Sequence, residues 1–203
     1  MKTLEFIFDF ASPNAYLVHK VLPGLVARTG ATLDYQLCLL GGIFKDTGNR
    51  APMIQFADIK GKVAYDMIEF GRFIAKHGLI DFKMNPHFPI NTVLAMRGAI
   101  AAEMEGMLMP YIDAVLHHMW EAPKKMDDPE VFVAALNESG LDGAMFAARA
   151  QDDDVKARLI LNTQSAVARG VFGIPTFFVG EDMFFGKERL AQVEEFLGAQ
   201  GAP

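Results

Sequence analysis

The chain is poor in cysteine, and this shortage excludes two kinds of site. Its 203 residues include a single cysteine, Cys38, so it cannot form a disulfide within itself or build a cysteine-rich zinc site. The flanking stretch Tyr35-Gln-Leu-Cys-Leu-Leu40 is apolar, which predicts Cys38 in a buried strand. His117 and His118 are adjacent, and neighbours on a helix point about 100° apart, so they do not share a face. We therefore expect no metal centre.

Basic charge and long apolar runs are also scarce. The chain has 19 Lys and Arg against 25 Asp and Glu, for a net charge of -6. This balance argues against a nucleic-acid-binding protein, because phosphate binding needs a basic face. No stretch approaches about 18 uninterrupted apolar residues, and the first residues lack the pattern of a secretion signal. These absences predict a cytoplasmic protein with no membrane or nucleic-acid partner.

What is present is the composition of an ordinary globular protein, 51% hydrophobic and 22% charged. Residues 4–10 are rich in β-forming side chains and predict a buried strand. Ser12 and Pro13 then suit the N-cap and the first position of a helix, and Gly30 suits its end. A second strand over residues 32–40 completes a β-α-β unit, and its crossover implies parallel strands.

The middle of the chain is typical of helices, and the end returns to strands. Residues 41–49 contain glycine and predict a loop. Residues 58–121 predict helices that are broken at Pro86, Pro89 and Pro110. A further helix is predicted to begin at residues 127–130, and another to cover residues 152–169. Strands 176–179 and 183–185 then predict a hairpin, and residues 187–197 a last helix. We therefore predict an α/β fold with a thioredoxin-like mixed-sheet core (β-α-β … β-β-α) and a large all-helical insertion. The predicted parts are core 1–45, insertion 46–150 and core 151–203.

Ser12 lies where the first strand gives way to a helix, in Phe8-Asp-Phe-Ala-Ser-Pro-Asn-Ala-Tyr-Leu17. The N–H groups of a first helical turn are unpaired, and the helix dipole favours negative charge there. In a thioredoxin-type fold this place carries two reactive cysteines, but here Ser12 and Ala15 hold the two positions. Thiol–disulfide exchange by the protein is therefore not available. A hydroxyl at this place can instead donate a hydrogen bond to a thiolate that a ligand supplies. The alternative is that Ser12 only caps the helix.

Pro175 directly precedes the predicted strand 176–179, in Gly170-Val-Phe-Gly-Ile-Pro-Thr-Phe-Phe-Val179. A cis Ile174–Pro175 bond would expose the backbone of Ile174, with which an extended peptide ligand can pair as a short strand. The alternative is a trans proline on an edge strand.

Together the two motifs resemble those of the 2-hydroxychromene-2-carboxylate isomerases and the related kappa-class glutathione transferases, in the DsbA-like branch of the thioredoxin superfamily. The resemblance covers nearly the whole chain and includes Pro89-Ile-Asn-Thr92, Ala95-Met-Arg97 and Phe184-Phe-Gly-Lys-Glu-Arg189. It implies glutathione as the cofactor, a small aromatic carboxylate as the substrate, and a homodimer. The implied reaction interconverts 2-hydroxychromene-2-carboxylate and trans-o-hydroxybenzylidenepyruvate, a step in bacterial naphthalene breakdown.

The resemblance also implies roles for individual residues. The Ser12 hydroxyl would bind the glutathione sulfur, and the main chain of Ile174, before Pro175, would bind the glutathione backbone. Asn49 resembles a residue of the family's glutathione-side loop, and its alternative is a turn residue. Lys62 would approach the glycyl carboxylate or the substrate acid, and its alternative is a solvated helix charge.

Two motifs depart from the family pattern. In Lys62-x-x-Tyr65-x-x-x-Glu69-x-x-Arg72 the usual Asp appears as Glu69. After Phe-Phe-Gly the family usually has a small or amide residue and then Asp, where this chain has Lys187 and Glu188. Glu188 would meet the γ-glutamyl ammonium, and Lys187 adds a charge where the pattern is neutral.

The resemblance predicts an apolar slot for the substrate ring. The candidates are Phe10, Phe44, Phe88 and Trp120, and the alternative for each is the plain core. Two other functions stay open, a kappa-class glutathione transferase or peroxidase and a non-catalytic thioredoxin-like peptide-binding module. A DsbA-type oxidoreductase is the weakest alternative, because both motif cysteines are absent.

Overall fold

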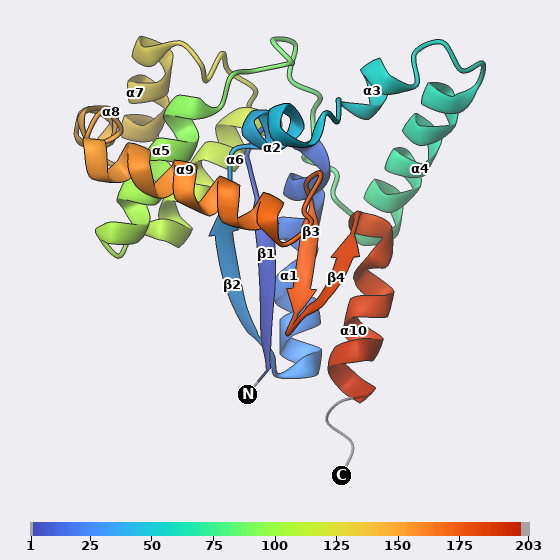
Figure 1. The fold of residues 1–203 in the computed structure, drawn as a ribbon. Coiled ribbons are helices and arrows are strands. Elements are labelled where there is room, and N and C mark those ends of the chain that lie inside the picture. The colour runs from blue at the N-terminus through green and yellow to red at the C-terminus, as the bar shows by residue number, and fades with distance from the viewer. Residues whose placement is uncertain (1, 200–203) are drawn as a thin grey trace.

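The chain forms an α/β fold in this computed structural model, which describes residues 2–199 (Figure 1). The strands are β1 (Thr3–Phe8), β2 (Thr32–Leu37), β3 (Thr176–Val179) and β4 (Asp182–Phe185). The helices are α1 (Pro13–Thr29), α2 (Leu40–Thr47), α3 (Pro52–Gln55), α4 (Lys62–His77), α5 (Val93–Met104), α6 (Leu108–Trp120), α7 (Pro129–Glu138), α8 (Gly143–Arg149), α9 (Asp153–Ala168), the 3-10 turn η1 (Lys187–Arg189) and α10 (Leu190–Ala199).

The strands lie side by side in the order β2-β1-β3-β4. β1 and β2 are parallel, with Thr3 opposite Thr32 and Phe8 opposite Leu37, as a crossover through α1 requires. β3 runs antiparallel to β1, and β4 runs antiparallel to β3. This mixed sheet confirms the predicted thioredoxin-like core, and the helices from α2 to α9 lie between β2 and β3 in the sequence. The divisions at residues 45 and 150 stay a prediction.

Aromatic side chains fill the centre of the sheet. The Phe6 ring lies 5.4 Å from that of Phe177, 5.3 Å from that of Tyr35 and 5.5 Å from that of Phe8, measured between centroids. α1 and α10 contact each other, while α9 contacts β2. Figure 1 shows helices α5 to α9 gathered on the β2 side of the sheet and α4 standing apart on the β4 side. Chain segments from both sides meet above the carboxyl end of β1, where the site described below lies.

Helix α2 occupies a segment whose glycines predicted a loop, residues 41–49, so that prediction is wrong. The first N–H group of the helix is satisfied by a side chain far away in the sequence, because the Leu40 N–H donates to Asp9 Oδ2 at 2.6 Å. Gly42 also permits close packing on α9. A Cβ at that position would lie 3.0 Å from Thr163 Cγ2.

Other boundaries differ from the predictions by a few residues. β1 ends at Phe8 and β2 at Leu37, before the predicted ends at residues 10 and 40. Cys38 is buried as expected, but it follows β2 instead of lying within it. Pro110 lies in the first turn of α6 and does not break that helix, because first-turn N–H groups need no intrahelical partner. Among the described residues, no helix is both long and apolar enough to cross a membrane.

Candidate active site

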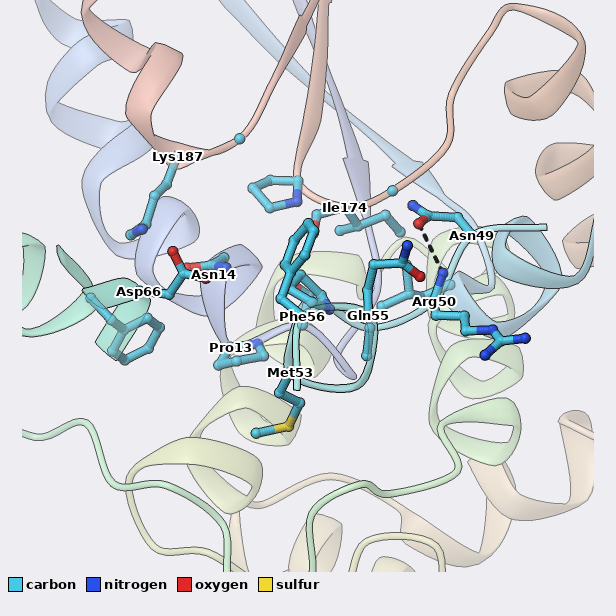
Figure 2. A pocket seen from close by; sticks show the side chains of 18 of the residues that line it. Pro13, Asn14, Asn49, Arg50, Met53, Gln55, Phe56, Asp66, Ile174 and Lys187 are labelled. Atoms are coloured by element: carbon cyan, nitrogen blue, oxygen red, sulfur yellow. Dashed lines mark hydrogen bonds between the residues drawn. The ribbon is translucent and has the colours of Figure 1, made fainter. Parts of the chain in front are cut away.

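A cavity of about 970 Å³ lies where the end of β1 meets the start of α1. Its wall combines the Ala11–Asn14 turn, the segment from α2 to α4, the loop before β3 and the turn after β4. Figure 2 shows side chains from these segments facing one another. The predicted site residues all line this cavity: Ser12, Asn49, Lys62, Ile174, Pro175, Lys187 and Glu188.

Ser12 is the N-cap of α1, with φ -92° and ψ 112°. Its Oγ accepts a hydrogen bond from the Ala15 N–H at 3.2 Å and donates one to the Ile174 carbonyl oxygen at 3.1 Å. Ser12 is only 4% exposed, yet it borders the cavity. The hydroxyl oxygen therefore caps the helix through a lone pair, while the hydroxyl proton is donated to a carbonyl oxygen of the loop before β3. Capping and a second role for the proton are compatible, because they use different parts of the hydroxyl.

Asp9 holds the turn between β1 and α1 in place through hydrogen bonds. It is fully buried, and its Oδ1 accepts from the Ala11 N–H at 2.8 Å and from the Thr92 hydroxyl at 2.7 Å, while Oδ2 accepts from the Leu40 N–H. Burial raises the pKa of Asp9, and these hydrogen bonds oppose the rise. One carboxyl group thus ties the Ser12 turn to the N-termini of α2 and α5. Asp9 was not singled out from the sequence, although an acidic residue between two phenylalanines at the end of a strand indicates a buried carboxyl group that needs hydrogen-bond partners.

The Ile174–Pro175 peptide bond is cis, and Ile174 is 7% exposed. The neighbouring contact comes from Asn49, whose Nδ2 donates to the Phe172 carbonyl oxygen at 2.7 Å. Asn49 Oδ1 accepts from the Arg50 N–H at 2.8 Å. Asn49 therefore fastens the segment after α2 to the loop that carries Ile174, which shapes the cavity wall on that side.

The two predicted lysines both have acidic partners. Lys62 Nζ pairs with Asp66 one turn further along α4 and lies 5.0 Å from the centre of the Phe56 ring. Lys187, 6% exposed, pairs with its neighbour Glu188. Glu69, which stands for the family's usual Asp, pairs with Arg72 instead of Lys62.

The buried Lys187 has an aromatic setting. Its Nζ lies 5.8 Å and 5.7 Å from the centres of the Phe70 and Phe73 rings, a cation–π arrangement that suits a desolvated ammonium. The side chain of Glu188 is 55% exposed, so only one member of that pair is withdrawn from water.

Asn14 is a second residue that sequence reasoning missed. It lies in the first turn of α1, two residues after Ser12, and lines the cavity. Its Oδ1 atom is buried and has no hydrogen-bond partner among residues 2–199. A buried carbonyl oxygen without a donor costs free energy, so this position suits a ligand that carries an N–H group.

Two of the four candidates for an aromatic slot line the cavity, and the slot itself stays a prediction. Phe44 and Phe88 line the cavity, together with Met53, Phe56 and Met84. Phe10 and Trp120 do not line it. Both are fully buried, and the Trp120 Nε1–H donates to the Phe10 carbonyl oxygen at 3.1 Å, so they belong to the core.

Cys38 lies outside the residues that line the cavity. Burial, with a smaller contribution from Asp9, raises the pKa of its thiol to about 12. The thiol is therefore protonated at neutral pH and does not replace the missing cysteine pair.

Comparison with known proteins places this geometry in a family. The family model for a DSBA-like thioredoxin domain matches residues 3–198. The 2-hydroxychromene-2-carboxylate isomerase of Pseudomonas sp. (strain C18) is 30% identical over 206 residues, covering 98% of this chain and 91% of that protein. The isomerase of the same name from Pseudomonas putida is 26% identical over 196 residues, covering 96% and 94%. Glutathione S-transferase kappa 1 of Rattus norvegicus is 26% identical over 209 residues, covering 97% and 91%.

Solved structures agree with this placement. A structure of a 2-hydroxychromene-2-carboxylate isomerase superposes with a TM-score of 0.82 at 26% identity, covering 98% of this chain and 95% of that one. Since the family match spans both the sheet and the helices between its halves, this chain belongs to the DSBA-like thioredoxin domain family.

Proposed function

We propose that this protein is a glutathione-dependent isomerase that interconverts 2-hydroxychromene-2-carboxylate and trans-o-hydroxybenzylidenepyruvate. The observation that carries the proposal is the Ser12 hydroxyl, held at the N-terminus of α1 on the wall of the cavity. The full-length similarity to isomerases of that name supplies the substrate class. Naphthalene breakdown is the corresponding proposed setting, and the homodimer and the cytoplasmic location stay predictions.

The residues present fit glutathione. The orphan Oδ1 of Asn14 offers an acceptor to an amide or ammonium group, and Glu188 offers an exposed carboxylate near the same wall. The Ile174 backbone lies beside Ser12, so an extended peptide bound along it would bring a cysteinyl side chain to the hydroxyl. Bound glutathione supplies a sulfur nucleophile that adds reversibly to the conjugated carbon and so permits rotation about the former double bond.

The protein's part is to keep that sulfur ionised. A free thiol has a pKa of about 8.5, and lowering it by two units needs about 2.7 kcal/mol of differential interaction. A hydrogen bond to a charged partner contributes about 1.5–3 kcal/mol, and a helix N-terminus adds about 0.3–1 kcal/mol. Ser12 and the first turn of α1 together reach this amount, provided that the hydroxyl turns its proton from Ile174 to the sulfur.

The direct test is Ser12→Ala, which we expect to lose about 10- to 1000-fold in turnover, the scale of one lost transition-state donor. Isomerase turnover is measured with 2-hydroxychromene-2-carboxylate at saturating glutathione, and glutathione binding by calorimetry. Ser165→Ala is the matched control, because Ser165 is exposed on α9 and does not line the cavity. Unchanged turnover in Ser12→Ala would remove Ser12 from the mechanism.

A kappa-class glutathione transferase or peroxidase is the second candidate, and the rat relative favours it. It uses the same Ser12 but releases the thioether product. Turnover of a generic electrophile with net consumption of glutathione would favour the transferase. Glutathione binding without any Ser12-dependent turnover would leave a peptide-binding module.

A further inference from the structure

Arg50 lines the cavity at its rim, directly after the residue that shapes that wall. Its backbone N–H is held by the Asn49 side chain, which is itself fastened to Phe172. Figure 2 shows Arg50 beside Asn49, at the opposite end of the cavity from Lys187. The Arg50 backbone is therefore held in place by Asn49, and its side chain is exposed.

The charges around the cavity leave Arg50 without a partner. Each acid on the wall pairs with a base: Asp66 with Lys62, Glu188 with Lys187, and Glu69 with Arg72. Arg50 alone of the basic residues on this wall makes no ion pair within residues 2–199. An anion that enters the cavity can therefore bind the Arg50 guanidinium without breaking an existing ion pair.

We propose that Arg50 is the carboxylate-binding residue of this cavity. The inference rests on the proposed function, in which both ligands are carboxylates. A guanidinium donates two parallel hydrogen bonds to a carboxylate, which gives orientation as well as attraction. Lys62, to which the sequence assigned this role, is neutralised by Asp66. The carboxylate belongs either to the electrophilic substrate or to the glycyl end of glutathione, and two experimental arms separate these sources.

The first arm uses an unreactive analogue of the substrate. Binding of 2-oxo-4-phenylbutanoate and of its methyl ester is measured by calorimetry at saturating glutathione. We expect wild type to prefer the acid by about 5- to 10-fold, Arg50→Gln to lose the preference, and Arg50→Lys to keep part of it. The preference should also shrink as the salt concentration rises, which a merely structural role would not produce.

The second arm compares glutathione with its glycyl ethyl ester in the same proteins. If Arg50→Gln loses the preference for free glutathione over the ester, and keeps the preference for the substrate analogue measured in the first arm, the carboxylate belongs to glutathione. Lys45→Gln is the matched control, because Lys45 is an exposed base nearby that does not line the cavity, and it should leave both preferences unchanged.

Unchanged preferences of Arg50→Gln in both arms, or no preference in wild type, would overturn the assignment to Arg50. Failure of the proposed function has a different signature. If wild type does not isomerise the chromene but Arg50→Gln still loses a carboxylate preference, the reaction is wrong and the carboxylate site stands.

Discussion

At the scale of single residues, the N-cap of α1 and a residue of its first turn differ in how their polar atoms are satisfied. The Ser12 hydroxyl has a donor and an acceptor within the protein, whereas Asn14 Oδ1 has no donor among the described residues. A buried acceptor without a partner lowers stability, and a ligand that supplies a donor recovers this cost. The two residues therefore respond differently to substitution.

We expect Asn14→Leu to weaken glutathione binding while leaving the protein equally or slightly more stable. Removing an unpartnered buried acceptor is neutral or stabilising, by up to about 1 kcal/mol in the free energy of unfolding, but removes one hydrogen bond to the ligand, about 5- to 10-fold in affinity. Urea denaturation and calorimetry measure the two quantities. A variant that loses stability and binds glutathione like wild type would show that Oδ1 has an internal role instead.

Residue types alone could not separate the pocket from the core. Phe44 and Trp120 were equal candidates for an aromatic slot, yet Phe44 lines the cavity and Trp120 packs inside. The difference arises from tertiary packing, because the Trp120 N–H finds the Phe10 carbonyl oxygen. In contrast, Ser12 and Pro175, which were singled out because strand ends, helix caps and prolines have strong local signals, both line one cavity.

At the scale of secondary structure elements, Asp9 joins three that are distant in the sequence. Its carboxyl group accepts from the turn after β1, from the first residue of α2 and from Thr92, which precedes α5. This long-range link explains why α2 was missed as a helix: its N-terminus is satisfied by Asp9, not by a local cap. The strands and α1 were predictable because their signals are local.

We expect Asp9→Asn to lower the free energy of unfolding by about 1–3 kcal/mol, because an amide nitrogen then faces one of three donors and leaves it unpaired. The measurement is urea denaturation, together with hydrogen exchange at the Leu40 amide, which should speed up. Thr92→Val removes one donor and keeps the carboxylate, so we expect a smaller loss of about 1 kcal/mol. Equal stability of wild type and Asp9→Asn would exclude the link.

At the scale of the whole molecule, the cavity wall draws on residues from Ala11 to Glu188. A ligand bound there contacts the first strand–helix turn, the helical region and the last hairpin together. Unfolding therefore has to release the ligand, and binding must raise the stability of the whole chain by mass action. Such a wall was not predictable as a surface, because its segments lie far apart in the sequence and come together only in the folded chain.

We expect glutathione at about 100 times its dissociation constant to stabilise the protein by about 2.7 kcal/mol, which raises Tm by about 5–10 °C for a chain of this size. Differential scanning calorimetry measures the shift. γ-Glutamylserylglycine, which has a hydroxyl in place of the thiol, should give a smaller shift. No shift with glutathione at any concentration would contradict a glutathione site.

The bond between Ser12 and the Ile174 carbonyl oxygen makes ligand capture an exchange of partners. A ligand with an uncharged oxygen replaces the hydrogen bond to the Ile174 carbonyl oxygen by another neutral hydrogen bond of similar strength, so its binding gains little free energy. An ionised sulfur receives a bond of about twice that strength, so only an anionic guest draws the proton away from the carbonyl. The resting contact thus discriminates by charge, and the preference for a thiolate over a neutral thiol follows from an interaction that contains no sulfur at all.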